Sequence, residues 1–259
     1  MRVRLLKFAV VCATIPVFAA GAQSIPGAVL AKNEPHHHPA YEDSTLRVLR
    51  VSVPGKDTTL LHEHAVDYFW IALGPSAVIN ARQGQPDATI TSADLSVHYT
   101  VGKFAHVARN PGAGPFNNIT VELLQSQGQV TNRCEEAVAN QTMVCTSAAG
   151  MRDDGVLERP AFETGKIVVS LVTVDPAAVI KGASRKGRSW FITLSVAEAV
   201  SLRIDGAGTA PAGAGRGGRA AAPASAWVGG TWRAPAGGIW TMKNTGTRAI
   251  QVLEVEPRP

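Results

Sequence analysis

The sequence is poor in cysteine, in aromatic side chains and in long apolar runs. Three cysteines occur in 259 residues, aromatic residues make up 6% of the chain, and no stretch of eighteen apolar residues follows residue 22. The last absence excludes a membrane-spanning helix from that part of the chain. Glycine and proline are plentiful instead, with 25 and 16 copies, which favours many short strands and turns over long helices.

The first 22 residues have the pattern of a secretory signal peptide. Arg2, Arg4 and Lys7 form a basic start, an apolar run covers residues 8–19, and the small residues 20–22 form an A-x-A-like cleavage site. The apolar run is too short to span a membrane. We therefore expect a mature chain that is secreted or periplasmic, with no membrane contact once the signal is removed.

Neither sign of charge dominates this mature chain. The formal charge of +5 includes the three basic residues of the signal, and without them 22 basic residues face 20 acidic ones. No basic stripe remains, which argues against a nucleic-acid partner. Cleavage also removes Cys12. In an oxidising compartment the remaining Cys134 and Cys145 most simply form one disulfide, with two free thiols as the alternative.

All seven histidines lie before residue 107, and three of them are placed to meet around one metal ion. His62 and His64 are two residues apart, so on a strand both imidazoles point to the same face. His106 follows another strand-like run and precedes Asn110, at the start of a turn rich in Gly and Pro. Since neutral imidazole is the commonest metal ligand, the three histidines predict a metal site.

A second group, His36-His37-His38, lies in residues 23–40, where prolines and glycines indicate an extended, flexible arm. Two roles remain open for it. The arm is either solvated and binds metal only adventitiously, or it folds over the mouth of the cavity and lends one imidazole.

Strand-like runs recur at short spacing between turn signals such as Pro54-Gly55 and Gly74-Pro75. Eight short strands with such punctuation are typical of an antiparallel jelly-roll barrel. The runs are residues 45–53, 59–64, 68–73, 76–81, 88–90, 96–101, 106–108 and 119–124.

The histidines and the glycines around them resemble the sequence motifs of the cupin superfamily. The first cupin motif joins a glycine, an H-x-H pair and a further glycine, and it is matched by Gly55, His62, His64 and Gly74, with one extra residue after Gly55. The resemblance implies a jelly-roll barrel with a metal ion held by histidines.

The second cupin motif runs from a glycine to a histidine followed four positions later by asparagine. Gly102, His106 and Asn110 match its ends, while residues 103–105 replace the Pro-x-Gly of the family. His106 is therefore the third ligand that the resemblance implies.

The chain also repeats itself at an offset of 121 residues. Tyr41-Glu42 before the run 46–53 correspond to Phe162-Glu163 before the run 167–174. Near the end, the whole second motif recurs in Gly229, Pro235, Gly237 and Asn244, except that Trp240 occupies the histidine position. The chain thus resembles a bicupin, similar to the quercetin-dioxygenase-like members of the family.

The second copy lacks the ligands of the first. At the offset of 121, the positions of His62 and His64 become Ala183 and Arg185. We expect Trp240 to fill this degenerate barrel and contribute packing and shape, with a second binding pocket as the alternative. The expected class is all-β, with two antiparallel jelly-roll barrels. The expected parts are a signal peptide at 1–22, the arm at 23–40, a metal-binding barrel at 41–125, a linker with the cysteine pair at 126–160, and the degenerate barrel at 161–259.

The carboxylate that usually completes a cupin metal site is missing from its place. The family has it four or five residues after the second histidine, whereas here position 68 is Tyr68 and the nearest acid is Asp67. On a regular strand Asp67 points away from the metal, but a one-residue bulge would bring it back. Either Asp67 completes the site or Tyr68 faces the cavity, where Phe104 and Asn110 are further candidates for the pocket.

A site of three histidines with or without one oxygen suits Fe(II), Mn(II), Ni(II), Zn(II) or Cu(II). Open positions on such an ion permit oxidation or isomerisation of a small organic molecule, as in a dioxygenase. The alternative is a non-catalytic cupin that binds a sugar, a small acid or the metal itself. Exposed barrel edges often form dimers, so a homodimer is possible, and the sequence leaves the oligomeric state open.

Overall fold

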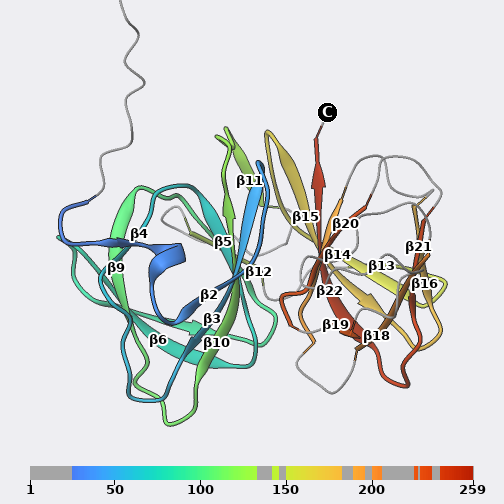
Figure 1. The fold of residues 1–259 in the computed structure, drawn as a ribbon, viewed down its shortest axis with the longest axis horizontal. Helices are drawn as coiled ribbons and strands as arrows, with labels where there is room; N and C mark the ends of the chain where they lie inside the picture. The colour runs from blue at the N-terminus through green and yellow to red at the C-terminus, as the bar shows by residue number, and fades with distance from the viewer. Residues whose placement is uncertain are drawn as a thin grey trace, which may run out of the picture.

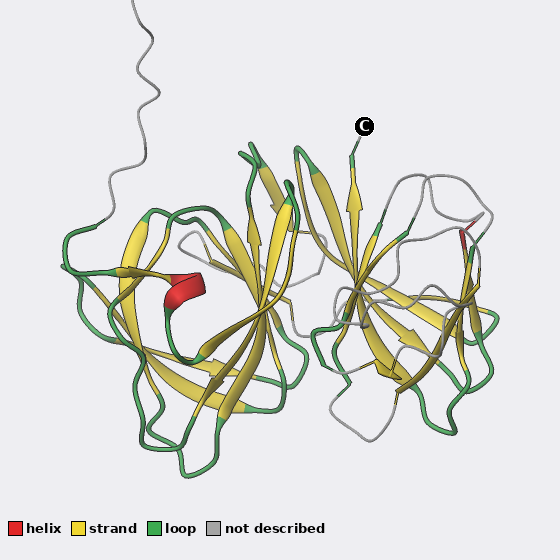
Figure 2. Ribbon diagram, in the orientation of Figure 1, coloured by secondary structure: helices red, strands yellow, loops and turns green. Residues whose placement is uncertain are grey.

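The structure, a computed structural model, describes residues 25–132, 142–145, 150–182, 189–195, 200–205, 225–226, 228–234 and 240–258. Within these ranges the regular structure is nearly all β-strand, with a 3-10 turn, η1 (Ala31–Asn33), near the start, and no helix there is long and apolar enough to cross a membrane. The strands form two barrels side by side (Figures 1 and 2). The expected all-β class with two antiparallel jelly rolls is confirmed.

The strands of the first barrel are β1 (Val29–Leu30), β2 (His37–Glu42), β3 (Leu46–Val53), β4 (His62–His64), β5 (Tyr68–Ala72), β6 (Ser76–Arg82), β7 (Ala88–Ser92), β8 (Val97–Thr100), β9 (Phe104–Arg109), β10 (Phe116–Leu123) and β12 (Thr142–Cys145). They form two sheets with the orders β1-β4-β9-β6-β7 and β12-β8-β5-β10-β3-β2. Apart from the parallel pair β1 and β4, the paired strands are antiparallel.

The strands of the second barrel are β11 (Val130–Asn132), β13 (Met151–Asp153), β14 (Val156–Thr164), β15 (Ile167–Val174), β16 (Val179–Lys181), β17 (Trp190–Thr193), β18 (Val200–Asp205), β19 (Ser225–Ala226), β20 (Thr231–Arg233), β21 (Thr241–Asn244) and β22 (Ile250–Pro257). One sheet has the order β11-β14-β15-β22-β17-β20, with β13 beside β14, and the other has the order β16-β21-β18-β19.

The repeat seen in the sequence reappears in the strand pairing. β3 pairs with β10 so that Val53 lies opposite Phe116, and β15 pairs with β22 so that Val174 lies opposite Ile250. The Nδ2 group of Asn110 donates to the carbonyl of Val53, and that of Asn244 donates to the carbonyl of Val174, both at 2.9 Å. Since the two valines are 121 residues apart, both barrels have the same asparagine-closed corner.

The largest sheets of the two barrels pack face to face, and alternation along each strand divides their side chains between two cores. On β3, Leu46 and Val48 belong to the cluster between the barrels, together with Phe162 and Trp190 of the second barrel. Val51 of the same strand points into the first barrel instead. These strands are buried on both faces for this reason.

The segment expected to be a flexible arm is folded onto the first barrel. β1 pairs with β4, and β2 pairs with β3 through an irregularity between Pro39 and Tyr41. The arm is held because Ala31, Glu34 and His37 are buried against the barrel. The arm at 23–40 is therefore an ordered part of the barrel wall over its described residues.

Strands also occur in the segment 126–160, which we expected to be a linker. β11 joins the second barrel through β14, whereas β12 joins the first barrel through β8. The second barrel also includes β13 and β14, so its strands begin before residue 161. Cys134 and the signal peptide at 1–22 lie outside the described residues, and for Cys145 only its place on β12 is described, so the disulfide stays a prediction.

Candidate metal centre

Two neighbouring strands carry the three histidines that the sequence singled out. His62 and His64 lie on β4, and the antiparallel pairing with β9 puts His62 directly opposite His106. Residues opposite each other in such a pair share a face, so all three imidazoles enter the barrel together. The ring centre of His62 lies 4.3 Å from that of His106 and 5.2 Å from that of His64.

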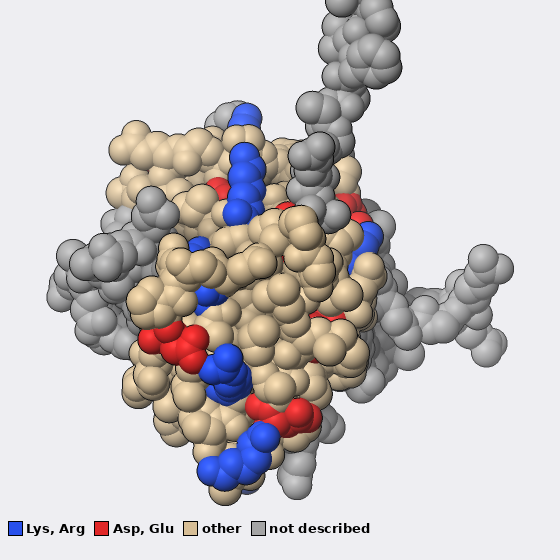
Figure 3. Space-filling view, turned by 90° about the vertical axis from the view of Figure 1, so that its left-hand side faces the viewer, with Lys and Arg blue, Asp and Glu red and all other residues tan. Residues whose placement is uncertain are grey.

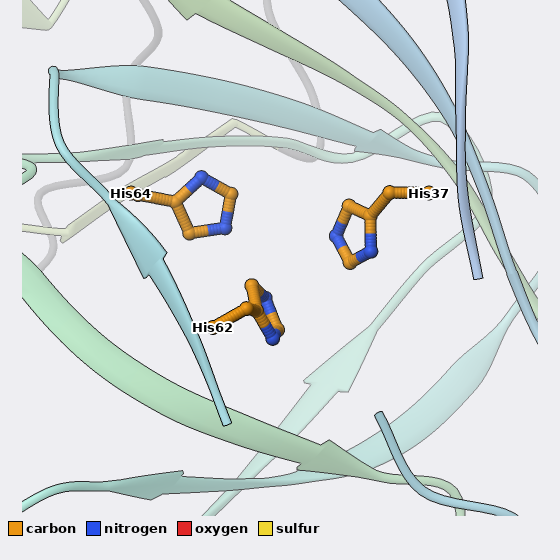
Figure 4. Close-up of side chains that lie close together, drawn as sticks. All are labelled: His37, His62 and His64. Atoms are coloured by element: carbon orange, nitrogen blue, oxygen red, sulfur yellow. The ribbon is translucent and has the colours of Figure 1, made fainter. Parts of the chain in front are cut away.

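A fourth imidazole, His37, comes from the folded arm. Its ring centre lies 4.7 Å from that of His62, and the potential ligand atoms of His37, His62 and His64 all lie within 4.8 Å of one another. Figure 4 shows these three side chains facing one another from two separate strands. Of the two roles left open for the arm, the structure has the one in which it contributes an imidazole. The other two histidines of the arm lie elsewhere: His38 is exposed, and the Nε2 atom of His36 lies 3.6 Å from Oδ2 of Asp57.

Each of the four imidazoles has its Nδ1 atom next to an oxygen that can accept a hydrogen bond. The acceptors are the Leu60 carbonyl for His62 (2.9 Å), Asn80 Oδ1 for His106 (2.7 Å), Glu34 Oε2 for His37 (2.6 Å) and Glu122 Oε1 for His64 (3.3 Å). Such contacts place the proton on Nδ1 and leave the lone pair on Nε2, as in metal-binding histidines.

Two of these lone pairs have no partner among the described residues. The Nε2 atoms of His62 and His106 are buried and make no hydrogen bond. Buried polar atoms in folded proteins are normally satisfied, so a pair of unsatisfied nitrogens in one cavity calls for a missing ligand. A divalent metal ion fits this donor set.

Burial keeps the imidazoles of His62, His64 and His106 neutral. It lowers the pKa of His62 to about 4, with a further contribution from His37. Burial and the neighbouring imidazoles also hold the pKa values of His64 and His106 well below the usual range. Because only the neutral imidazole binds metal, these three ligands are available at neutral pH without losing protons first.

The surroundings of Glu34, the carboxylate that contacts His37, lower its pKa. Burial raises the pKa of Glu34, but hydrogen bonds from His37 and from the backbone N–H groups of Leu60 and His36 outweigh it and lower the pKa overall. Glu34 is therefore an ionised acceptor that links the arm to the segment before β4 and to the imidazole of His37.

The histidines line a cavity of about 80 Å³ inside the first barrel. This is room for a metal ion with water molecules or for a small organic molecule. The wall beyond the histidines is largely apolar, and half-buried residues of β6, β7 and β9 form one side. Besides the four histidines, the lining consists of Val51, Tyr68, Trp70, Val78, Asn80, Arg82, Ile90, Thr100, Ala108, Phe116, Asn118 and Thr120.

The structure does not bring Asp67 to the histidines. Its carboxylate accepts hydrogen bonds from the Tyr99 hydroxyl at 2.6 Å and from the Gly102 N–H at 3.1 Å. Asp67 shares the alternation of Phe69 and Ile71, which face the second barrel. The bulge that would have turned Asp67 inward is absent from the described pairing of β5.

Tyr68 faces the cavity instead. Its ring stacks on that of His64, with centres 3.8 Å apart and planes 17° apart. Burial raises the pKa of its hydroxyl, so the phenol stays protonated. Tyr68 thus supplies a neutral hydroxyl beside the histidines rather than a charged ligand.

The two other pocket candidates lie just outside the lining. The Phe104 ring packs against His106 and under the guanidinium of Arg82, at 3.5 Å from the ring centre. Asn110 closes the barrel corner by donating to the carbonyls of Val53, Pro54 and Gly114. Both residues support the site without entering the cavity.

Sequence reasoning missed Asn80 and Arg82. They alternate along β6, and the pairing with β9 puts Arg82 opposite His106. The only local signal was this alternation of two polar residues in an apolar run, which does not reveal the partner strand.

Aromatic side chains pack the described interior of the second barrel. Trp240 is 1% exposed and packs against Trp232 and Phe191. Gly182 touches the Trp240 ring so closely that a Cβ atom would lie 2.6 Å from it. Trp240 therefore fills this barrel, as expected, while Ala183 and Arg185 lie outside the described residues.

The charged surface beside the first barrel is sparse. Figure 3, which looks at the side of that barrel, shows acidic and basic side chains interspersed on a largely uncharged face. This view has no continuous patch of one sign.

Comparison with known proteins supports the fold. No protein-family model matches the sequence, and no curated protein matches it by sequence. Solved structures do match. AerE from Microcystis aeruginosa, with 8% identity and a TM-score of 0.60, covers 87% of this chain, and 94% of its own length is matched. Oxalate decarboxylase from Bacillus subtilis, with 12% identity and a TM-score of 0.54, covers 85% of this chain and is matched over 74% of its length. The fold is that of the cupins. Among the described residues, His37, His62 and His64 form a cluster that could hold a metal ion.

Proposed function

We propose that this protein is a metal-dependent cupin enzyme, an oxidoreductase of the dioxygenase type that acts on a small organic molecule inside the first barrel. The observation that carries the proposal is the convergence of four imidazoles whose Nδ1 atoms are all held by oxygens. Such outer contacts orient metal ligands and raise their basicity.

The donor set limits the metal without naming it. Four imidazole nitrogens and no thiolate suit Fe(II), Mn(II), Ni(II), Zn(II) or Cu(II). One structural neighbour, oxalate decarboxylase from Bacillus subtilis, is described with Mn(II) centres, which makes manganese the first metal to try.

His62, His64 and His106, with His37 from the arm, would hold the ion. When bound, such an ion can activate dioxygen or water, or polarise a carbonyl. The chain's own residues would do the rest. Trp70, Phe116 and the other apolar lining residues exclude bulk water. The protonated Tyr68 hydroxyl is placed to donate a hydrogen bond to a bound molecule.

The second candidate is a non-catalytic cupin that binds a small ligand or the metal itself. It is favoured by the absence of Asp and Glu from the described residues that line the cavity. A site without a carboxylate has no obvious general base for proton abstraction. This also makes oxidation a better candidate than isomerisation.

The signal-peptide pattern in residues 1–22 supports export. We therefore infer that the enzyme works in the periplasm or outside the cell, and that metal loading occurs in the mature chain. Cell fractionation of the full-length protein tests this inference, since retention in the cytoplasm would overturn it.

Metal content of the mature protein tests the main proposal. We expect close to one metal ion per chain after loading and dialysis, and loss of that metal in His106→Ala. His38→Ala is the matched control, because His38 is an exposed histidine of the arm and its loss should leave the metal content unchanged. Equal metal in all three proteins, or none in any, would contradict the proposal.

Oxygen uptake then separates the two candidates. The metal-loaded protein is screened with small organic molecules in an oxygen electrode, beside His106→Ala. Substrate-dependent uptake that His106→Ala abolishes supports the enzyme. Ligand binding with no turnover across the screen favours the binding protein.

A further inference from the structure

We propose that the cavity takes a small carboxylate, and that the Arg82 guanidinium binds it beside the histidine cluster. This inference rests on the proposed function, because it names the class of molecule that the same cavity accepts. Three features of the first barrel carry it.

The first feature is the position of Arg82. Its pairing partner across the strands is His106, so the two side chains lie on one face, and both line the cavity. The Phe104 ring holds the guanidinium from below, at 3.5 Å from the ring centre. Stacking on an aromatic face restrains an arginine without using its hydrogen-bond donors.

The second feature is that Arg82 has no anionic partner in the described part of the chain. Among the described residues it makes no ion pair, and its buried Nε atom has no hydrogen-bond acceptor. Arginine is always charged, and a buried donor without an acceptor is costly. By contrast, Arg47 contacts both Glu42 and Glu122, and Arg109 contacts Asp87. Arg82 is therefore a cation prepared for an acceptor that the barrel itself does not supply.

The third feature is the charge of the complete site. Imidazole ligands are neutral, so four of them leave the charge of a divalent ion in place. The described lining contains no Asp or Glu. Two carboxylates that contact the histidines are already engaged, Glu34 by His37 and Glu122 by Arg47 and His64. An organic anion would compensate both the metal and Arg82.

A carboxylate satisfies these features better than a neutral molecule. Its two oxygens match the planar fork of donors on a guanidinium, which makes such pairs short and strong. The cavity of about 80 Å³ limits the molecule to a small acid, and the apolar wall of Trp70, Ile90 and Phe116 suits a short carbon skeleton. Asn118 and Thr120 line the same space and offer further polar contacts.

Calorimetric titration tests the proposal with propionate, succinate and the neutral isostere propionamide. The protein is the mature chain, measured both metal-loaded and after chelation, with the metal content of each sample determined. We expect propionate or succinate to bind, and propionamide to bind at least about tenfold more weakly. Equal binding of propionate and propionamide would overturn the proposal.

Variants then assign the contact. Arg82→Gln should weaken carboxylate binding about tenfold or more while keeping its metal content, and Arg82→Lys should recover part of the loss. Arg109→Gln is the matched control, since Arg109 is an exposed arginine on β9 and should not matter. Carboxylate binding that is unchanged in Arg82→Gln would refute the assignment. A chain that retains no metal but still binds propionate through Arg82 would refute the proposed function while supporting this inference.

Discussion

His98 should make the protein less stable in mild acid. It lies on β8 with no exposed surface, and its ring stacks flat on that of Trp70 at 3.8 Å between centres. The Ser96 hydroxyl donates to the carbonyl of Ala93, so it accepts the Nε2–H group of His98 at 2.9 Å. The proton of the neutral ring is thereby on Nε2. Protonation of the buried, unpartnered Nδ1 would create a donor with no acceptor.

The size of the effect follows from the pKa. Burial lowers the pKa of His98 from 6.5 to about 4. Below pH 6.5 the unfolded chain takes up a proton that the folded chain refuses, so stability is complete above that pH and is lost as the pH falls toward 4. Between pH 7 and pH 5 this one histidine should cost about 2 kcal/mol in the free energy of unfolding. That is a large part of the stability of an ordinary domain.

Urea unfolding followed by tryptophan fluorescence measures this loss. Wild type and His98→Gln are compared at pH 7 and pH 5 in the presence of a chelator, so that the histidines of the metal centre titrate alike in both proteins. Glutamine keeps a polar group near the position of Nε2 but takes up no proton. Wild type should lose about 2 kcal/mol more than His98→Gln over this range, which corresponds to a midpoint shift of about 1 M urea.

The matched control is His38→Gln, which changes an exposed histidine of the arm. It should keep the pH dependence of wild type. If wild type and His98→Gln lost the same stability between pH 7 and pH 5, the reasoning from burial and tautomer would be refuted.

Three further changes test other parts of the fold and site. Gly102→Ala should lower the free energy of unfolding by about 2–3 kcal/mol, seen as a lower Tm, because its Cβ would lie 2.0 Å from the Val66 carbonyl oxygen. The control is Gly114→Ala, whose Cβ meets no atom within 4 Å, and an equal loss of stability in that variant would contradict the prediction. Asn110→Ala removes three hydrogen bonds to backbone carbonyls and should lower the free energy of unfolding in urea by about 3 kcal/mol, with the metal content unchanged. Loss of metal without loss of stability would instead show that Asn110 belongs to the metal site. Glu34→Gln should weaken metal binding about ten- to a hundredfold in a chelator competition, and an unchanged affinity would show that His37 is not a ligand.

Much of this molecule follows from local sequence rules. The spacing of His62 and His64 puts both imidazoles on one face because a strand alternates with a period of two. The same alternation, without a bulge, turns the Asp67 side chain away from the two histidines, as expected for a regular strand. Short strands between Gly and Pro turns predicted the jelly rolls, and the offset of 121 residues predicted two related barrels.

The completed site depends on which strands become neighbours, and local patterns do not specify that. His37 reaches the cluster because β2 adds to β3, and Arg82 faces the cavity because β6 pairs with β9. Glu34 and Glu122 act through hydrogen bonds to His37 and His64, residues 3 and 58 positions away. The sequence by itself therefore determined the barrels, their repeat and three of the imidazoles, since these depend on periodicity and motif spacing. Only the tertiary structure decided the fourth imidazole, the oxygens that orient all four and the position of Arg82 at the cavity, because long-range strand pairing brings them together.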